Sequence, residues 1–332
     1  MAKDQVGVGI LGVGFVGGQA HAPAFKKIPG SKLIGLAAKT EQRVRPLAEK
    51  YDVEYFLDYM DLIRRPDVDA VVVATPTPSH YEQAKAAIEC GKHVMCEMPL
   101  ASTIAQVHEL GKLAEKAGVI MMPVLNFRYV PNYVRAKELL NQGAIGSAMA
   151  VCFREFIPAR DLAAQWPRES WAWDKAISGG YPDFTLSVWS IDLLRWLLGT
   201  EYAETEWKTN YIPLEEFGGI LGYTTVGLAR MTNGVVCSLL YSCMTSTTAP
   251  SSRLEIFGKS TATLCAEWNN SLILTKEEPA RQEWRFKEQG TRVWGHYQMD
   301  EHFISSVLGK TEPEVTIEDG RKAQEIAAKM VA

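Results

Sequence analysis

The hydrophobic pattern of the first 125 residues alternates short, continuous apolar runs with longer amphipathic stretches. Continuous runs rich in valine and isoleucine are typical of strands buried on both faces, and their alternation with helices is typical of a parallel sheet. The pattern therefore predicts a doubly wound nucleotide-binding domain. We expect its strands at 6–12, 32–38, 68–74, 92–97 and 119–124, and its helices at 15–27, 41–51, 78–90 and 103–117.

After residue 124 the predicted strands follow one another directly instead of alternating with helices. Apolar and polar positions alternate within each strand, and Gly, Asn or Ser turns separate the strands, which indicates antiparallel pairing. This half is therefore predicted to be an α+β domain with a large, mostly antiparallel open sheet. We expect helices at 131–142, 183–198, 298–308 and 318–330, a strand within 144–156, a loop at 157–180 and the alternating strands between 203 and 286.

Composition narrows the class of protein. A chain of 332 residues is long enough for two cores, and 47% hydrophobic with 22% charged residues is ordinary for a globular protein. The net charge of −4 argues against nucleic acid or an anionic membrane as the main partner. No apolar run approaches the roughly 18 residues of a membrane span. The first residues enter a strand pattern without a basic and then apolar leader, so we expect no secretion signal.

Cysteines and histidines carry little sign of special chemistry. None of the six cysteines forms a C-x-x-C pair and most lie in apolar runs, so we expect reduced thiols in a cytoplasmic protein. The six histidines are scattered and show no metal-ligand spacing. We therefore expect no metal site, and a small molecule as the partner.

Residues Gly12–Gly17, GVGFVG, match the pattern G-x-G-x-x-G. The pattern follows the first predicted strand and opens the first predicted helix, which is the context of a dinucleotide-binding loop. Gly12 is expected to make the tight turn, Gly14 to let the backbone approach a pyrophosphate, and Gly17 to let helix and strand pack closely. The loop, with Phe15 and Val16, is therefore a predicted phosphate-binding site.

The end of the second strand predicts which dinucleotide binds. An acidic residue there would bind the ribose 2′-hydroxyl of NAD(H) and would repel the 2′-phosphate of NADP(H). The chain has Ala38 at this position, followed by Lys39 and Thr40, with Arg43 one helical turn further. A small residue followed by a cation and a hydroxyl favours a phosphate, so we expect NADP(H) in preference to NAD(H). The alternative is that the two cations are solvated surface charges.

Four stretches carry a family resemblance: GVGFVGGQAHAPAF from residue 12, VDAVVVATPTPSHYEQAKAAIECGKHVMCEMPLA from 68, NFRYVPNYVRAKELLNQGAIG from 126 and SGGYPDFTLSVWSIDLLRWLLG from 178. In this order they resemble the glucose–fructose oxidoreductase, inositol dehydrogenase and rhizopine-catabolism family over nearly the whole chain. The resemblance implies a Rossmann domain, placed at 1–124, and a substrate-binding and oligomerisation domain at 125–332. It also implies a nicotinamide site between them and a homodimer or homotetramer formed through the second domain's sheet.

The resemblance also assigns residues to the cofactor and substrate. The nicotinamide-side ribose would lie along Thr75, Pro76 and His80. That ribose, or the dihydronicotinamide end, would be held by Glu97 and Met98. The domain junction would lie near Asn126 and Arg128. For His80, the alternative is a residue that caps the start of its own helix.

The chain departs from the family at three positions that handle protons. The family typically has E-K-P where this chain has Glu97, Met98 and Pro99, and it has an aspartate and a histidine at the positions of Thr185 and Trp189. Oxidising a secondary alcohol also removes the hydroxyl proton, and a positioned acid or base contributes roughly 10²–10⁴-fold to such a step. Met98, Thr185 and Trp189 cannot act as bases near neutral pH. The chain is therefore expected to be an atypical member.

Several interpretations stay open. The first is an oxidoreductase with a relocated acid or base, for which Tyr181 and Asp183 are the nearest candidates. A family branch resembling dehydrogenases of aromatic ring-cleavage semialdehydes also has an aliphatic residue in place of the lysine. The second is a pseudo-dehydrogenase that binds cofactor and regulates or senses, as a galactose-pathway repressor in the family does. A third is hydride delivery to a planar conjugated substrate with water as acid, as in biliverdin reductases of similar fold. A fourth is transient oxidation by a tightly bound cofactor during bond cleavage.

Aromatic residues gather in the segment expected to face the nicotinamide. Trp166, Trp171, Trp173, Tyr181, Phe184 and Trp189 all fall between residues 157 and 190. They favour an apolar or planar substrate, although sugars also stack on rings and the rings could be ordinary core. A semialdehyde or hemiacetal is a further candidate, because a substrate that ionises easily relaxes the demand for the missing base. Arg160 and Arg168 could hold a substrate carboxylate. The substrate candidates are thus Arg128, Arg160, Trp173, Thr185 and Trp189.

Overall fold

The computed structural model describes residues 4–178, 180, 182–246, 252–267, 271–277, 281–286 and 294–330. Tyr181, a candidate proton donor, lies outside these residues. The chain divides into two compact units, residues 1–126 with 289–324 and residues 127–288 with 325–332. The sequence-based boundary at 124 assigned every C-terminal helix to the second domain, whereas the structure groups 294–324 with the first unit. Sequence order hides this grouping because it follows from long-range contacts, such as that between Gly320 and the side chains of Leu100 and Pro123.

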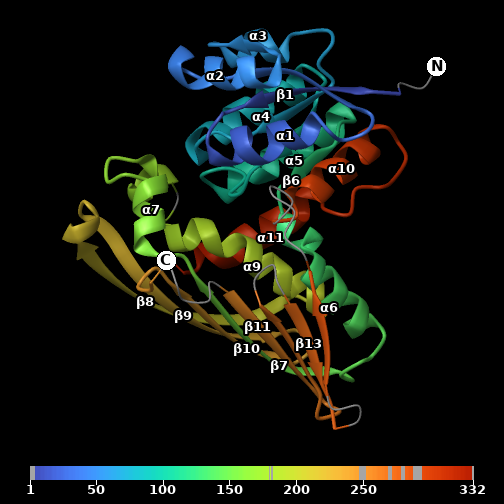
Figure 1. Ribbon diagram of the computed structural model, residues 1–332, viewed down its shortest axis with the longest axis vertical. Helices are drawn as coiled ribbons and strands as arrows, with labels where there is room; N and C mark the ends of the chain where they lie inside the picture. Colours follow the sequence, from blue (N-terminus) through green and yellow to red (C-terminus); the bar gives the residue numbers. More distant parts are fainter. Residues whose placement is uncertain are drawn as a thin grey trace. The chain divides into compact units, whose positions relative to one another are not determined.

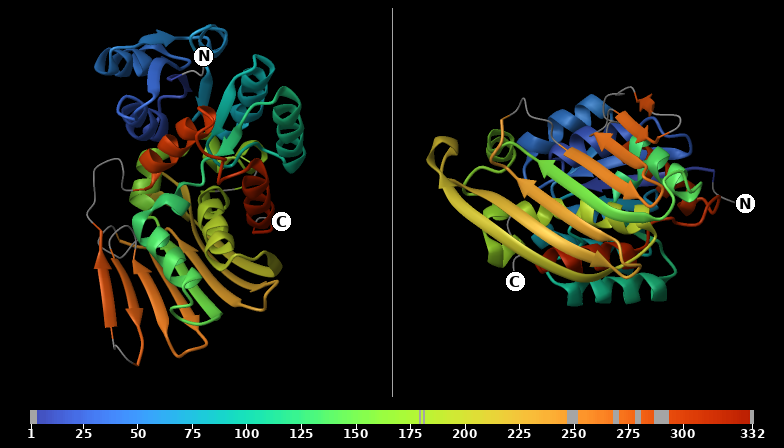
Figure 2. Two further views of the ribbon diagram at one scale, coloured as in Figure 1. Left: turned by 90° about the vertical axis from the view of Figure 1, so that its right-hand side faces the viewer. Right: turned by 90° about the horizontal axis from the view of Figure 1, so that it is seen from below.

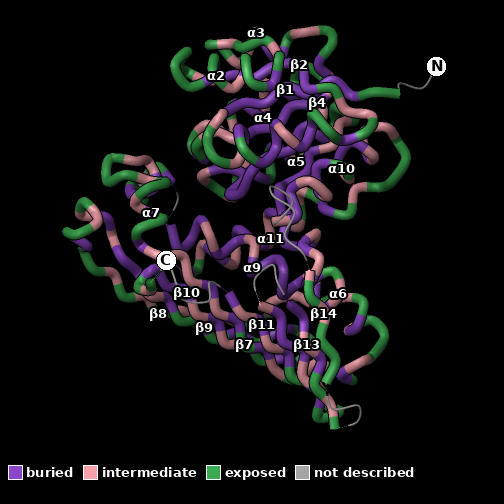
Figure 3. Tube along the Cα trace, viewed as in Figure 1, coloured by how far each residue is buried: buried purple, intermediate pink, exposed green. Residues whose placement is uncertain are grey.

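The first unit contains a six-stranded parallel sheet with strand order β3-β2-β1-β4-β5-β6 (Figure 1). Its central strands β1 and β4 are buried along their whole length, because helices cover both faces of the sheet (Figure 3). The prediction of a doubly wound domain is confirmed. The strands are β1 (Val6–Leu11), β2 (Ser31–Ala37), β3 (Glu54–Phe56), β4 (Ala70–Val73), β5 (His93–Cys96) and β6 (Met121–Pro123).

The helices of this unit follow the predicted pattern with two differences. The helix expected over 15–27 is a π-helical turn, Val16–His21, followed by the short α1 (Ala22–Phe25). β3 and α3 were missed because three to five residues are too few to show a period. The remaining helices are α2 (Glu41–Tyr51), α3 (Tyr59–Ile63), α4 (His80–Glu89), α5 (Ile104–Ala117), α10 (His296–Val307) and α11 (Ile317–Ala328), the last of which crosses the boundary at residue 324.

Local sequence explains where α5 begins and ends. Thr103 and Gln106 form a capping box, in which each side chain accepts a hydrogen bond from the other residue's backbone N–H. Gly118 ends the helix with φ 64°, a conformation that favours glycine. These caps support the predicted helix over 103–117.

The second unit contains an eight-stranded sheet, with order β14-β13-β12-β11-β7-β10-β9-β8 (Figure 2). Only the β7–β10 pair is parallel among the described strands, so the prediction of a mostly antiparallel sheet is confirmed. The strands are β7 (Ala148–Phe156), β8 (Tyr202–Leu214), β9 (Ile220–Met231), β10 (Val236–Ser242), β11 (Ser252–Gly258), β12 (Thr263–Glu267), β13 (Ser271–Thr275) and β14 (Arg281–Arg285).

Helices α6 (Pro131–Asn141) and α9 (Pro182–Leu198) pack on this sheet and on each other. The expected loop at 157–180 is wrong, since it contains α7 (Ala159–Gln165), a 3₁₀ turn at Trp171–Trp173 and α8 (Lys175–Ser178). The helices in this segment are too short to show a helical period in the hydrophobic pattern, and the segment is rich in Pro, Gly and Trp. No described helix is long and apolar enough to cross a membrane.

Candidate active site

The loop that follows β1 has the geometry of a phosphate cradle. Gly12 has φ 92°, and a Cβ there would collide with the carbonyl of Ala74 at the end of β4. A Cβ on Gly17 would collide with the carbonyl of Gly12, so this glycine permits close packing of the π-helical turn against the loop. A Cβ on Gly14 would meet no protein atom within 4 Å. The side chain missing at Gly14 therefore leaves space for a ligand, and the loop fits a dinucleotide.

The end of β2 carries no acid. Ala38 is half-buried just beyond the strand, and Lys39, Thr40 and Arg43 are exposed at the start of α2. Phe15 and Val16 lie at the start of the π-helical turn, and the Phe15 ring is 45% exposed. The ring of Trp294 lies 5.2 Å from that of Phe15, which brings the start of α10 beside the phosphate loop.

His80 connects the ends of β4 and β5. Its Nε2 lies 2.6 Å from the carbonyl of Thr75, and its Nδ1 lies 2.8 Å from the carbonyl of Pro99. The pKa of His80 is lowered, because the effect of burial exceeds that of the two carbonyls, which act to raise it. The Thr75 hydroxyl donates to Gln83, while Pro76 is exposed. Both nitrogens of His80 are thus engaged by backbone, and this side chain shapes the edge of the sheet.

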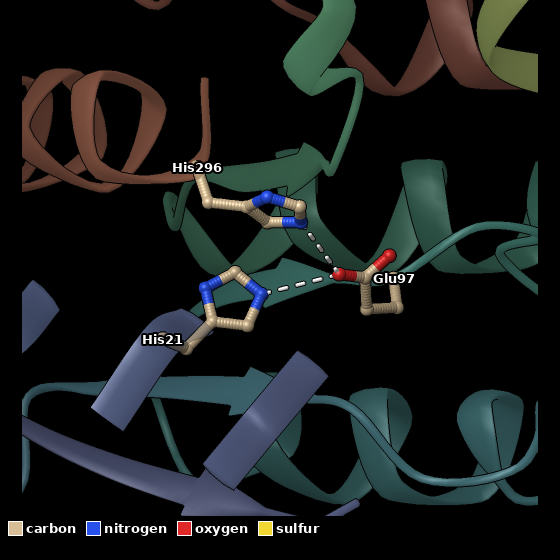
Figure 4. Close-up of side chains that lie close together, drawn as sticks. All are labelled: His21, Glu97 and His296. Carbon is tan, nitrogen blue, oxygen red and sulfur yellow. Dashed lines mark hydrogen bonds and ion pairs between the residues drawn. The ribbon is translucent and has the colours of Figure 1, made fainter. Parts of the chain in front are cut away.

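A buried cluster lies at the same carboxyl edge (Figure 4). His21, from the π-helical turn, places Nδ1 at 2.9 and 3.0 Å from the two carboxylate oxygens of Asp300, and Nε2 at 3.2 Å from Oε1 of Glu97. His296, at the start of α10, points its Nε2 to the same Oε1 at 3.7 Å. His21 and Asp300 are fully buried, and Glu97 and His296 are only 7% and 5% exposed.

The electrostatics of the cluster favour a proton on His21. Burial alone would lower the pKa of His21, but Asp300 and Glu97 together raise it to about 10. Burial would raise the pKa of Glu97, but the neighbouring imidazoles of His21 and His296 lower it to about 2. Burial raises the pKa of Asp300, although His21 acts to lower it. We therefore place the proton of this pair on His21, between Asp300 and Glu97, and Glu97 is ionised at neutral pH.

The cluster also has the residue types of a divalent metal site. The facing atoms of His21, Glu97 and His296 lie within 4.8 Å of one another, although sequence spacing had predicted no such group. A metal would have to displace the proton of His21. It would also need a lone pair on Nε2 of His296, whereas Asn126 Nδ2 lies 3.5 Å from Nδ1 and donates to the Trp294 carbonyl at 2.6 Å. Because Nδ1 faces a donor, the proton of His296 lies on Nε2, toward Glu97. The hydrogen bonds therefore favour protons over a metal, and the absence of a metal stays a prediction.

Met98 lies beside this cluster. It is 4% exposed, and its backbone N–H donates to Oε2 of Glu97 at 3.3 Å. The thioether offers no exchangeable proton. The cluster thus contacts the backbone of the position at which the resemblance expects a lysine.

The second unit has its own buried polar group at the start of α9. Oδ2 of Asp183 accepts hydrogen bonds from Tyr211 at 2.8 Å and from Thr225 at 3.0 Å. Burial raises the pKa of Asp183, although the hydrogen bonds from these two hydroxyls act to lower it. Oδ1 of Asp183 and Oγ1 of Thr185 are buried without a partner among the described residues. A ligand with hydroxyl groups could satisfy both atoms.

The remaining substrate candidates differ in environment. Arg128 is buried and donates to Asp192 at 2.7 and 2.6 Å. Asp192 and Arg195, three residues apart on α9, are 1% and 6% exposed and bonded at 3.0 Å, so this pair braces the helix from within the unit and does not lie at the surface. Their three-residue spacing is typical of a surface pair, but Arg128, from the 3₁₀ turn Asn126–Tyr129, adds a second buried cation beside Asp192. The others are Arg160, exposed on α7, Trp173, buried with Nε1 donating to Trp166, and Trp189, half-buried with its ring 6.5 Å from Phe127.

Sequence reasoning missed His21, His296, Asp300 and Trp294. The sequence separation of His21 and Asp300 is 279 residues, so no local pattern joins them. A signal did exist, since His296 and Asp300 are four apart on one helix and so share a face. This pair alone did not indicate a site, because the sequence does not show that Glu97 lies beside it in the fold.

Comparisons with known proteins agree with this architecture. A model described as an oxidoreductase family with an NAD-binding Rossmann fold matches residues 6–124, and one for the C-terminal alpha/beta domain of an oxidoreductase family matches 137–332. The chain is 27% identical over 321 residues to a myo-inositol 2-dehydrogenase from Thermotoga maritima, spanning 95% of this chain and 92% of that protein.

Solved structures give the same result. A probable dehydrogenase from Thermotoga maritima matches with TM-score 0.80 and 27% identity, over 97% of this chain and 94% of that chain. A levoglucosan dehydrogenase in complex with NADH and L-sorbose matches with TM-score 0.84 and 21% identity, over 98% and 96%, which shows the shared fold.

Proposed function

Because the chain belongs to the glucose–fructose oxidoreductase, inositol dehydrogenase and rhizopine-catabolism family of oxidoreductases, we propose that it moves a hydride between a nicotinamide dinucleotide and a small hydroxyl or carbonyl compound. The observation that carries this proposal is the phosphate cradle, in which Gly14 leaves space that no protein atom uses. Gly12 and Gly17 support it, because each lies where a side chain would collide with backbone.

We propose NADP(H) as the preferred cofactor. The end of β2 offers no carboxylate for a ribose 2′-hydroxyl, and Lys39, Thr40 and Arg43 are exposed where a 2′-phosphate would lie. The competing expectation is NAD(H), which the levoglucosan dehydrogenase carries in its reduced form. Dissociation constants for both cofactors decide between them, and tighter binding of NAD(H) would overturn the preference.

For the substrate, we propose first a sugar or polyol. The relatives include a myo-inositol 2-dehydrogenase and a levoglucosan dehydrogenase. Asp183 and Thr185 each offer a hydroxyl a buried oxygen that no described residue hydrogen-bonds. The second candidate is an apolar or planar carbonyl, or a semialdehyde or hemiacetal. It is favoured by Met98 at the lysine position and by the rings of Trp173 and Trp189.

An alternative function is a pseudo-dehydrogenase that binds cofactor without turnover and regulates or senses. It is favoured by Met98, Thr185 and Trp189, which replace three proton-handling groups of the family. Cofactor binding without oxidation or reduction of any compound in a broad panel would support it.

We also propose a homodimer or homotetramer formed through the sheet of the second unit. Strands β9 and β10 present apolar side chains on the exposed face of the sheet, at Val226, Leu228 and Val236. Exposed apolar groups of this kind mark interfaces. Light scattering should give a dimer or tetramer mass, and Leu228→Lys should lower it; a monomer in the wild type would contradict the proposal.

The cradle itself is tested by Gly14→Ala. The added methyl group meets no protein atom, so the variant should fold like the wild type, yet it should weaken cofactor binding at least about tenfold, or ~1.4 kcal/mol. Gly111→Ala is the matched control, because its methyl group, on α5 and outside the loop, would make ordinary contacts with Ile317. Equal affinity of both variants in calorimetric titration would remove the loop from the binding site.

A further inference from the structure

The carboxyl edge of the six-stranded sheet indicates where the reacting end of the cofactor would lie. In this strand order a dinucleotide binds across the carboxyl edge where the order reverses, between β1 and β4. The adenosine half would then lie over β1 and β2, and the nicotinamide half over β4 and β5. Glu97 directly follows β5, and Trp294 contacts the phosphate loop through Phe15. The buried cluster of Figure 4 thus belongs to the nicotinamide half.

Most ionisable groups of the cluster are fully engaged. His21 directs one nitrogen to Asp300 and the other to Glu97, and it holds its proton tightly. Asp300 is fully buried with both oxygens on His21. Oε1 of Glu97 faces two imidazoles. None of these three groups is placed to exchange a proton with a substrate.

His296 is the exception. Its Nε2 faces the Glu97 carboxylate. Its Nδ1 carries the lone pair and, among the described residues, faces the amide of Asn126 alone, at a long 3.5 Å. A carboxylate behind an imidazole orients the ring, fixes its tautomer and stabilises the imidazolium that forms on proton uptake. The charged groups that face it are Glu97 from β5, His21 from the π-helical turn and Asp300 from its own helix.

We propose that His296 is the proton-exchanging group of the reaction, in place of the missing lysine, with Glu97 as its orienting carboxylate and the His21–Asp300 pair as positioning residues for Glu97. This rests on the proposed oxidoreductase function. In the oxidation of an alcohol, the C–H bond breaks and its electron pair leaves as hydride to the nicotinamide. The O–H bond breaks as the carbonyl forms, and its proton passes to Nδ1 of His296. In reduction, both transfers reverse.

The test compares His296→Gln with His302→Gln in steady-state turnover. Glutamine keeps a donor toward Glu97 but cannot carry a proton, so kcat should fall about 10²–10³-fold, while the KM for cofactor stays within about twofold. His302 is half-exposed on the same helix and accepts a surface hydrogen bond from the N–H of Glu314, so its variant should keep wild-type kcat. Added imidazole should raise the kcat of His296→Ala at least about tenfold, which a structural role would not produce.

Equal kcat in the His296→Gln and His302→Gln variants would overturn this role and leave the oxidoreductase function intact. A wild type that binds cofactor but turns over no compound in the panel would overturn both. Nitrogen-15 histidine spectra of the wild type give a second measurement that needs no variant to fold. We expect the neutral form of His296 to carry its proton on Nε2, and an Nδ1–H tautomer would overturn the assignment.

Discussion

Replacing His21 by glutamine should change stability in a pH-dependent way. The variant removes the positive charge between Asp300 and Glu97 and leaves two buried carboxylates facing an amide. In the wild type, Asp300 and Glu97 overcome the effect of burial and raise the pKa of His21 from 6.5 to about 10. Because the folded state binds this proton more tightly than the unfolded chain, the group stabilises the fold.

The magnitude follows from the two pKa values. The difference between 6.5 and about 10 corresponds to about 5 kcal/mol at most, and breaking a buried ion pair costs about 3–5 kcal/mol. The stabilisation is complete below about pH 6.5 and is lost as the pH rises toward about 10. Between these values it should fall by about 1.4 kcal/mol per pH unit.

The assay is urea unfolding followed by circular dichroism, for the wild type and for His21→Gln, at several values from about pH 6 to about pH 10. Titrating groups outside the cluster act equally in both proteins, so the difference isolates His21 together with Glu97 and Asp300, whose pKa values rise when the imidazolium is lost. We expect a difference of about 3–5 kcal/mol at low pH that shrinks steadily with rising pH. A difference that stays constant, or that grows with pH, would refute a protonated His21; His302→Gln should differ from the wild type by only tenths of a kcal/mol.

The other predictions concern the cofactor loop, the substrate group and metals. Gly12→Ala, which places a side chain at φ 92° against the Ala74 carbonyl, should lower the free energy of unfolding by about 1–3 kcal/mol in urea titration, and an unchanged value would show that the turn relaxes. Ala38→Asp should shift the ratio of the two cofactors' dissociation constants at least about tenfold toward NAD(H), and a constant ratio would remove this position from the ribose site. Asp183→Asn should lower kcat/KM about tenfold or more, because one partner of a substrate hydroxyl changes; unchanged kcat and KM would exclude Asp183. Dialysis against a chelator should leave turnover unchanged, because protons occupy the facing atoms of the buried cluster, and a loss restored by zinc would contradict this.

The sequence predicted features that depend on neighbouring residues. The glycine loop was recognisable because three glycines, a strand and a helix start lie within a dozen residues, and continuous apolar runs located β1 and β4. The antiparallel half was recognisable from alternation, which β9 retains in its burial pattern. The π-helical turn has a period that amphipathic patterns do not show, so the orientation of His21 could not be predicted.

The buried cluster needed the tertiary structure. Its members come from the π-helical turn, the end of β5 and the start of α10, and only packing brings them together. The same limit applies to Asp192 and Arg195, whose spacing is typical of a surface pair but which are buried with Arg128. Burial of a charge is decided by distant partners, so spacing along one helix did not reveal it.

The proposed hydride transfer is tested most directly by the absorbance of reduced nicotinamide. The wild type and Gly14→Ala are mixed with NADP⁺ or NAD⁺ and a panel of sugars, polyols and semialdehyde hydrates. We predict that the wild type reduces a cofactor with at least one compound, and that Gly14→Ala, folded like the wild type, does so at least about tenfold more slowly at limiting cofactor. Tight binding of cofactor by the wild type without reduction by any compound would contradict the account.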